Sequence, residues 1–435
     1  MLQKLQNHLQ INFPFLKENK LLLAVSGGID SMVLVYLFKQ LQFDFAVAHC
    51  NFQLRGNESN GDEDFVKSIC DSLSIPLFAQ KFDTKQFAAD YKLSIQLAAR
   101  KLRYDWFYEL LEKEDCDYIL TAHHLDDSLE TFLINFSRGT GLDGLTGIPN
   151  QNDKIIRPLL PFSRSDIEVF AKENAIQWRE DSSNASDKYL RNKLRHDVIP
   201  VLKELNPNLL TSFEKTVENL KQSQSLVEDA TKLVYKMVVE ENDTLLKINL
   251  KELLKLPNYT AYLFQWLKQF EFTAWDDIYA LANAQSGKQV FSENYVLLKD
   301  RDYLILSAQV DKQEDEVFYV EKNQKDVKIP LNMSICNISD ISNANPNCIF
   351  VDEDKLQFPL IIRKWEEGDY FYPLGMQGKK KLSKYFKDEK LSLIDKSSQW
   401  LLCSDNQIVW VVGIRQDERF KIDTTTKNLL KIQIE

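Results

Sequence analysis

Residues 20 to 134 alternate short apolar runs with helical patterns, and this alternation limits the folds open to the chain. Four runs are expected as strands: LLLAV (21–25), FAVAHC (45–50), IPLFAQ (75–80) and YILTA (118–122). Between them, SMVLVYLFKQL, DEDFVKSICDSL and the stretch 86–112 repeat apolar residues every three or four positions, as helices do. The sequence therefore predicts an α/β domain, a doubly wound and mostly parallel sheet with helices on both faces.

The pattern changes further along the chain, which at 435 residues is too long for one core. We expect the α/β domain to cover 1–210. A long amphipathic helical pattern then predicts a mainly helical domain over 211–310, closed by strands at VFSENYVLLK and YLILSA. After a polar linker, in which VFYV is a candidate edge strand, short β-like runs predict a small mixed α/β domain over 327–435.

Composition excludes several classes of protein. The N-terminus lacks the features of a secretory signal and no apolar run approaches about 18 residues, so we expect a cytoplasmic protein without membrane contact. The net charge of -10 means that any nucleic-acid contact must depend on local basic clusters. The six cysteines are scattered without a CxxC pair, which suggests buried thiols and neither a disulfide framework nor a metal cluster.

A glycine loop, SGGIDS, follows the first expected strand and precedes a helix. Ligands of open parallel sheets bind at the carboxyl ends of the strands. Glycines there let the backbone approach an anion, and the helix offers free N–H groups. The loop matches neither GxxxxGK[ST] nor GxGxxG. The sequence predicts a phosphate-binding loop, with a plain glycine turn capped by Asp30 as the alternative.

A second cluster, TAHHLDDSLET, follows the fourth expected strand on the same edge. Asp127 and Glu130 are three positions apart and share a helix face, so they could bind a metal ion or an ammonium group. The alternative is that acidic residues favour a helix N-terminus. His123 and His124 also raise a metal site, although ring packing or hydrogen bonding to a nucleotide is the preferred interpretation.

Arginines and lysines gather at three places. Arg100 and Arg103 lie one turn apart, and if their face borders the glycine loop a guanidinium could stabilise charge on a reacting phosphate. One basic cluster lies near the end of the first domain: Lys188, Arg191, Lys193, Arg195 and His196. Another, interleaved with Tyr385 and Phe386, comprises Lys379, Lys380, Lys381, Lys384, Lys387 and Lys390. Both suit RNA phosphates, with a solvated helix face as the alternative for the second.

These motifs together resemble one enzyme family. SGGIDS is similar to the pyrophosphate loop of the PP-loop ATPases. The series HCNFQLRG, AARKLRY, TAHHLDDSLET, RGTGLDGL, RPLL, DSSN with RNKLR, and the C-terminal RKWEEGDYFYPLGMQGKKKLSKYF and WVVGIRQDERF resembles tRNA(Ile)-lysidine synthetases. The resemblance implies the PP-loop type of α/β fold, also described as adenine nucleotide alpha hydrolase-like.

The resemblance also implies a two-step reaction. ATP adenylates the C2 oxygen of the wobble cytidine, position 34 of the CAU anticodon of a minor tRNA(Ile), and pyrophosphate leaves. The ε-amine of free L-lysine then attacks C2 and expels AMP, which forms lysidine. Holding amine and activated base together removes much of the entropic barrier.

Roles follow from the matched motifs. The resemblance implies that ATP is bound by Ser26, Gly27, Gly28, Ile29, Asp30 and Ser31. Asp30 and Asp127 would hold Mg²⁺, Asp127 and Glu130 would hold lysine, and Arg103 would assist adenylation. Asp30, Arg103 and Asp127 are thus the expected catalytic residues. The expected tRNA-binding residues are Arg191, Asn192, Arg195, Lys379, Lys380 and Lys381.

Two alternatives stay open. Another PP-loop tRNA-modifying enzyme such as a tRNA 2-thiolase is weakened by the absence of a CxxC pair. A catalytically silent tRNA-binding protein would not need Asp30, Arg103, Asp127 and Glu130 together. The sequence does not reveal the oligomeric state and leaves a homodimer open.

Overall fold

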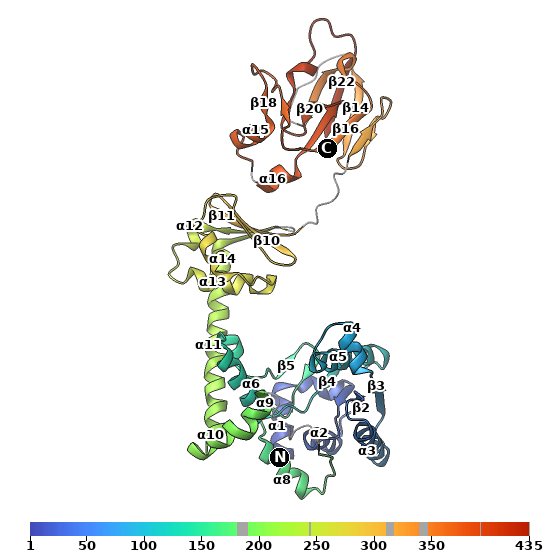
Figure 1. The fold of residues 1–435 in the computed structure, drawn as a ribbon, viewed down its shortest axis with the longest axis vertical. Coiled ribbons are helices and arrows are strands. Elements are labelled where there is room, and N and C mark those ends of the chain that lie inside the picture. Colours follow the sequence, from blue (N-terminus) through green and yellow to red (C-terminus); the bar gives the residue numbers. More distant parts are fainter. Residues whose placement is uncertain (181–189, 243–244, 310–316, 339–346, 392, 435) are drawn as a thin grey trace. The chain divides into compact units, whose positions relative to one another are not determined.

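The computed structural model describes residues 1–180, 190–242, 245–309, 317–338, 347–391 and 393–434 (Figure 1). The chain divides into two compact units, Met1–Glu228 and Asp229–Glu435. The DSSN motif (181–184) and Lys188 lie outside the described residues. Among the helices that are described, none combines the length and the apolar character needed to cross a membrane.

The first unit contains a six-stranded sheet in the order β3-β2-β1-β4-β6-β5. All neighbouring strands are parallel except the β5–β6 pair, which confirms the predicted doubly wound α/β domain. The strands are β1 (Leu21–Ala24), β2 (Phe45–Asn51), β3 (Leu77–Lys81), β4 (Tyr118–Leu120), β5 (Gln151–Asn152) and β6 (Ile155–Ile156).

The helices of this unit connect the strands and precede and follow the sheet. They are α1 (Leu2–Asn12), η1 (Pro14–Glu18), α2 (Ile29–Gln40), α3 (Asn57–Leu73), α4 (Thr84–Asp90), α5 (Ile95–Lys113), α6 (Leu125–Arg138), α7 (Leu142–Leu145), α8 (Arg164–Glu173), α9 (Leu190–Lys193), η3 (Leu194–Val198) and α10 (Ile199–Leu205). Helix α11 (Leu209–Val238) begins here and extends into the second unit.

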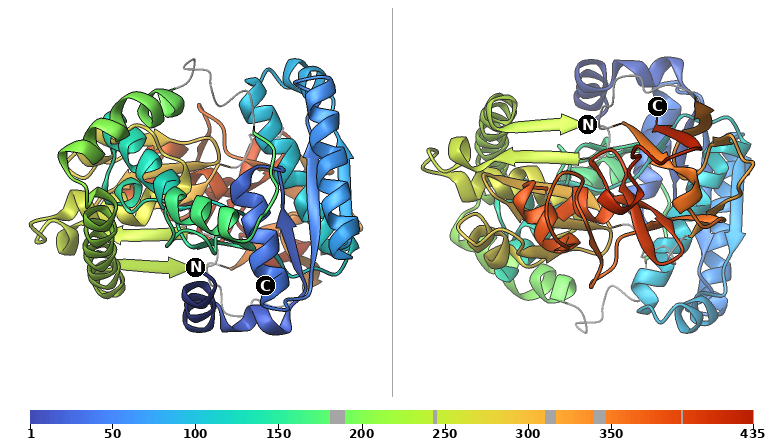
Figure 2. Two further views of the ribbon diagram at one scale, coloured as in Figure 1. Left: turned by 90° about the horizontal axis from the view of Figure 1, so that it is seen from below. Right: turned by 90° about the horizontal axis from the view of Figure 1, so that it is seen from above.

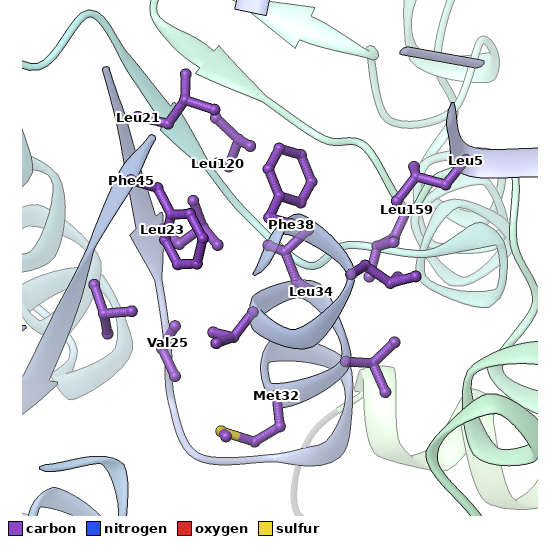
Figure 3. Close-up of a cluster of buried hydrophobic side chains, with 14 of the residues drawn as sticks. Leu5, Leu21, Leu23, Val25, Met32, Leu34, Phe38, Phe45, Leu120 and Leu159 are labelled. Atoms are coloured by element: carbon purple, nitrogen blue, oxygen red, sulfur yellow. The ribbon is translucent and has the colours of Figure 1, made fainter. Parts of the chain in front are cut away.

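Different helices cover the two faces of the sheet. Successive side chains of a strand point to opposite faces, so neighbouring residues of β1 contact different helices. Leu21 and Leu23 of β1 belong to one buried cluster with Leu34 and Phe38 of α2 (Figure 3). Leu22 belongs to a second cluster with residues of α5. Helices accordingly flank the blue strands in Figure 2. Burial of β1 on both faces fixes the centre of the sheet, from whose carboxyl edge the chain leaves after Ala24.

The expected single helix over 86–112 is wrong in one respect, because the structure has two helices, α4 and α5. Lys92 between them has φ 53°, which ends α4. Ser94 then caps α5, and its hydroxyl accepts a hydrogen bond from the Leu97 amide at 3.3 Å. A serine in this position favours a new helix start over continuation.

The second unit begins with a five-stranded antiparallel sheet in the order β7-β8-β11-β10-β9. Its strands are β7 (Val239–Asn242), β8 (Leu245–Asn249), β9 (Gln289–Phe291), β10 (Tyr295–Asp300) and β11 (Tyr303–Ala308). The helices are α12 (Leu250–Leu253), α13 (Tyr259–Leu267), η4 (Lys268–Phe270) and α14 (Trp275–Leu281). VFSENYVLLK therefore forms a hairpin, β9 and β10, and YLILSA forms β11.

The C-terminal part has sheets ordered β12-β16-β19-β20-β21, β13-β14-β22-β15 and β17-β18. Strand β12 lies at the edge of the first of these, which confirms VFYV as an edge strand. The strands are β12 (Phe318–Val320), β13 (Asp326–Val327), β14 (Met333–Ile338), β15 (Cys348–Asp352), β16 (Leu360–Lys364), β17 (Tyr370–Phe371), β18 (Lys380–Lys381), β19 (Trp400–Ser404), β20 (Gln407–Val411), β21 (Arg415–Gln416) and β22 (Leu429–Ile434). The helices are η5 (Glu353–Lys355), α15 (Leu382–Asp388), α16 (Leu393–Ser398) and η6 (Glu418–Phe420).

The expectation that all six cysteines are buried is wrong for two of them. Cys336 is exposed and Cys50 is half-buried, while the other four are buried. Along β14 the inward positions are Met333 and Ile335, so the alternation of the strand turns Cys336 outward.

Candidate functional site

The glycine loop joins β1 to α2 at the carboxyl edge of the parallel sheet. Gly27 has φ 92°, a conformation that L side chains rarely adopt. The Ser31 hydroxyl braces the turn on two sides: it accepts from the Ser26 amide at 3.2 Å and donates to the Gly28 carbonyl at 2.9 Å. These contacts hold an open backbone turn at the N-terminus of α2, as anion binding requires.

Helix α3 and the segment after α8 pack against this loop. A Cβ added to Gly27 would lie 3.4 Å from Val66 and 4.0 Å from the Asp62 carbonyl. The backbone amide of Arg179 donates to the Gly27 carbonyl at 3.0 Å. The side chain of Arg179 donates through Nε to the Asp62 carboxylate at 2.6 Å. Arg55 donates to the other oxygen of Asp62 at 2.8 Å. Asp62 therefore holds two arginines, of which Arg179 also contacts the loop.

Asp30, in the first turn of α2, faces the cluster at the start of α6. Its carboxylate accepts from Arg164 Nη1, 2.7 Å from both oxygens. His124 Nε2 lies 3.7 Å from Asp30 and 3.4 Å from Asp127. The imidazole thus stands between two carboxylates that were expected to share a metal ion.

Asp127 and Glu130 point to the same place, as their spacing predicts. Arg195 contacts both: its Nε lies 2.6 Å from Glu130 Oε1 and its Nη2 lies 3.2 Å from Asp127 Oδ1. Arg191 Nε lies 3.3 Å from Glu130. Two arginines that were expected to bind tRNA therefore contact the carboxylates that were expected to bind lysine.

Burial sets the electrostatics of this contact. The Glu130 side chain is 1% exposed, and burial raises its pKa although Arg195 opposes the shift. For Arg195 burial works against the charged form, but hydrogen bonding and charge from Glu130 outweigh it and raise its pKa. Burial of the charged Glu130 carboxylate without a partner would cost free energy. This carboxylate is therefore suited to bind a cation, either a guanidinium or an ammonium group.

Asp126 has a different role from Asp127. It is buried and accepts hydrogen bonds from Lys203 Nζ at 2.6 Å and from the Arg164 amide at 2.8 Å. Burial works against its charged form, yet these two donors outweigh burial and lower its pKa. Asp126 thereby joins α6 to the start of α8, and so holds Arg164 beside Asp30.

His123 shares a 2.9 Å hydrogen bond with the Thr121 hydroxyl. Burial lowers its pKa to about 4, helped by Arg157 and Arg191 and opposed by Asp127. The ring is therefore uncharged at neutral pH. Such a ring suits packing or hydrogen bonding to a nucleotide, which is the role preferred from the sequence.

Arg103 does not join the acidic cluster in the part of the chain that the structure describes. Its guanidinium lies 5.2 Å from the ring centroid of Phe52, just beyond β2. Its charge acts on Cys50 near the end of that strand. Arg100 lies over Tyr104 at 5.0 Å. Arg103 thus stands at the carboxyl edge of the sheet, on the β2 side of the glycine loop.

Asn192 is half-buried in α9. In the C-terminal part, Lys379 and Lys381 are exposed, and Lys380 pairs with Asp388 at 2.7 Å. Lys379 lies 5.0 Å from the centroid of Tyr370, which is 46% exposed. Tyr385 and Phe386 are buried in the core, so the aromatic residue on this basic surface is Tyr370. The interleaving seen in the sequence arises because one face of α15 is buried through Leu382, Tyr385 and Phe386, while the lysines of this helix lie on its exposed side.

The carboxylates fit a magnesium ion only in part. Mg²⁺ is usually held by one or two carboxylates together with substrate phosphates. Asp30 and Asp127 both face His124, but each also contacts an arginine. Within the described ranges no group of three His, Cys, Asp or Glu residues is arranged to hold a metal ion. Substrate phosphates would therefore have to complete the set.

Sequence reasoning missed four residues of the site: Asp62, Arg164, Arg179 and Lys203. One signal was available, because SRSD at 163–166 has the spacing of a capping box, and the structure shows this box at the start of α8. It predicts the helix start but not the contact of Arg164 with Asp30, which lies 134 positions away.

Three protein families match the chain in succession. The PP-loop domain matches residues 1–202, the TilS substrate binding domain matches 240–309, and the TilS substrate C-terminal domain matches 360–434.

Curated relatives match nearly the whole length. A tRNA(Ile)-lysidine synthase of Parabacteroides distasonis is 39% identical over 420 residues, 95% of this chain and 95% of the relative. Those of Bacteroides thetaiotaomicron and Porphyromonas gingivalis W83 are 37% and 34% identical, over 99% and 92% of this chain and 99% and 91% of the relatives.

Proposed function

The chain belongs to the tRNA(Ile)-lysidine synthase family, and from this membership we propose that it joins free lysine to C2 of the wobble cytidine of a minor tRNA(Ile) with a CAU anticodon. The reaction consumes ATP and releases pyrophosphate and AMP. The observation that carries the proposal is the convergence of Asp30, in the glycine loop, and Asp127, one helical turn from Glu130, on His124.

In the first step, the backbone of Ser26 to Ile29 and the Ser31 hydroxyl would hold the phosphates of ATP. The C2 oxygen of cytidine would attack the α phosphate, and pyrophosphate would leave. Arg103 would stabilise charge that builds on the reacting phosphate. Asp30 and Asp127 would hold Mg²⁺, which neutralises phosphate charge when it is bound.

In the second step, Asp127 and Glu130 would hold an ammonium group of lysine. Arg195 contacts both carboxylates with its guanidinium, which supports cation binding at this point. The lysine cation and Arg195 would compete for the same oxygens, so Arg195 would move when lysine enters. The ε-amine would then attack C2, and AMP would leave as the C2–O bond breaks.

Residues 211–310 and 327–435 would bind tRNA as separate domains after a catalytic domain over 1–210. Arg191, Asn192, Arg195 and Lys379 to Lys381 would contact RNA phosphates. We also propose a cytoplasmic protein, with a homodimer as one option for its assembly.

The test is pyrophosphate release and transfer of labelled lysine in the same reaction. The enzyme should release pyrophosphate only when ATP, Mg²⁺ and tRNA(Ile) are all present, and should transfer label only when lysine is added. Release without lysine transfer, together with incorporation of sulfur from a donor, would assign the chain to the thiolases. Tight tRNA binding without any pyrophosphate release would identify a silent binding protein.

A further inference from the structure

Arg157 is a buried cation that the proposed reaction does not use. It follows β6 directly, and the Thr121 amide donates to the carbonyl of the preceding Ile156 at 3.0 Å. The residue is 6% exposed. Its Nη1 donates to the Pro149 carbonyl at 2.8 Å, while its Nε is buried and has no hydrogen-bond partner among the residues that the structure describes. Within the described ranges, no carboxylate pairs with this guanidinium.

Among the described residues, the titratable groups that act on the charge of Arg157 are Arg100 and Tyr104. Burial lowers the pKa of Arg157, Arg100 acts in the same direction, and Tyr104 opposes the shift. The charge of Arg157 in turn contributes to the low pKa of His123. An unpaired buried charge is costly, and buried guanidinium groups are normally paired with an anion. The surroundings therefore suit an anionic ligand that comes from outside the chain.

The position of Arg157 separates this anion from the one at the glycine loop. Strand β4 lies between β1 and β6. Neighbouring strands are about 4.8 Å apart, so the ends of β1 and β6 are about 10 Å apart across the edge of the sheet. A phosphate at Arg157 would thus lie on the far side of His123 from the loop that holds pyrophosphate.

We propose that Arg157, together with Arg100, forms a second phosphate-binding site at the carboxyl end of β6. This inference rests on the proposed function, since the reaction brings two kinds of phosphate to this edge: the phosphate of AMP and the backbone phosphates beside the target nucleotide. Arg157 binds one of these phosphates through its Nε and a free edge of the guanidinium plane, as arginines commonly do. The site holds the substrate on the side opposite the leaving pyrophosphate.

The competing explanation is purely structural, because Arg157 also ties the chain at Pro149 to the end of β6. Two variants separate the explanations. Arg157→Gln keeps a side-chain donor for the Pro149 carbonyl but removes the charge, and Arg157→Lys keeps the charge but loses the planar fork. Thermal melting of both variants shows whether the fold is retained.

The probes are AMP and unmodified tRNA(Ile), each bound to the full-length enzyme without turnover. If the ligand is AMP, Arg157→Gln should weaken AMP binding about tenfold, the size of one charge-assisted hydrogen bond, with Arg157→Lys in between. If it is an RNA phosphate, the slope of log affinity against log salt should fall by about 0.7 to 0.9 in Arg157→Gln. Arg363→Gln, which removes a guanidinium paired with Asp369, is the control and should leave AMP binding unchanged.

Weaker AMP binding or a smaller salt slope for tRNA binding in Arg157→Gln supports the site, and the quantity that changes identifies the phosphate that is bound. A folded Arg157→Gln variant that binds AMP and tRNA with unchanged affinity and salt slope overturns it. Because binding is measured without catalysis, this result does not depend on whether lysine is transferred, and failure of the proposed function would instead appear as a lack of pyrophosphate release by the unaltered enzyme.

Discussion

Ion pairs in the two units join residues at very different sequence separations. At the site of the first unit, Arg164 and Asp30 are 134 positions apart in the sequence. Arg179 and Asp62 are 117 positions apart. In the C-terminal sheets, Arg363 and Asp369 are 6 apart and Arg419 and Asp417 are 2 apart, although Lys355 and Asp423 are 68 apart. The fold therefore brings the ion pairs of the first site together from distant parts of the chain. Most described ion pairs of the second unit join residues that are close in sequence and stabilise local turns.

This difference predicts that loss of one charge changes chemistry in the first unit and affinity or stability in the second. The largest effect is expected for Asp30→Ala, because it removes the carboxylate next to the phosphate loop. Pyrophosphate release should fall by about 100-fold or more, the usual cost of losing an electrostatic group that acts in the transition state. Filter binding should show nearly unchanged tRNA affinity, and a large loss of tRNA binding would contradict this division of roles.

Glu130→Gln should have the next largest effect. The KM for lysine is expected to rise about tenfold to 100-fold, since a hydrogen bond to a charged group contributes about 1.5 to 3 kcal/mol. The KM for ATP should change little, because the glycine loop is intact. Steady-state transfer of labelled lysine measures both constants.

Glu218→Gln is the control for this variant, because Glu218 makes an exposed ion pair with Lys215 in α11. It should leave both constants unchanged. A Glu130→Gln enzyme with an unaltered KM for lysine would remove this carboxylate from the substrate site.

Asp62→Asn and Asp369→Asn form a matched pair that tests the comparison directly. Their side chains are 12% and 14% exposed, and both accept from arginines. Each change should lower the free energy of unfolding by about 1 to 3 kcal/mol, as measured by urea denaturation. Only Asp62→Asn should also raise the KM for ATP, by about threefold to tenfold, because Arg179 links Asp62 to Gly27.

Two results would contradict the expected difference between the two units. An unchanged KM for ATP in Asp62→Asn would show that the loop holds its shape without the arginines. A raised KM for ATP in Asp369→Asn would show that local pairs of the second unit also influence nucleotide binding.

The smallest effect on catalysis is expected when Lys379, Lys380 and Lys381 are all replaced by glutamine. Phosphate contacts supply salt-dependent affinity, so the slope of log affinity for tRNA against log salt should fall by about 2 to 3. Pyrophosphate release at saturating tRNA should be retained. Fluorescence anisotropy over a salt series measures the slope, and an unchanged slope would make this cluster a solvated surface.

The parallel sheet, the glycine loop and the shared face of Asp127 and Glu130 were predictable from the sequence, because each depends on residues close together in the chain. The break between α4 and α5 was missed since the apolar pattern continues across Lys92 and the Ser94 cap is a weak local signal. The outward position of Cys336 was missed because thiols are usually buried.

Long-range contacts at the site could not be predicted in this way. Nothing near Arg195 in the sequence indicates that it contacts Glu130, and nothing near Asp62 indicates that it gathers Arg55 and Arg179. A basic cluster is equally suited to RNA phosphates and to buried carboxylates, and only the fold brings the two groups together. Arg157 belongs to the RPLL motif, but nothing in that motif indicates that its guanidinium is buried.

The most direct test of the account is nucleoside mass spectrometry of tRNA(Ile) after incubation with the enzyme, ATP, Mg²⁺ and lysine. The account predicts one new nucleoside, in the anticodon at position 34, with the mass of cytidine plus lysine less one water, and its absence when Asp30→Ala replaces the unaltered enzyme. A sulfur-containing nucleoside, or unmodified cytidine at that position despite pyrophosphate release, would contradict it.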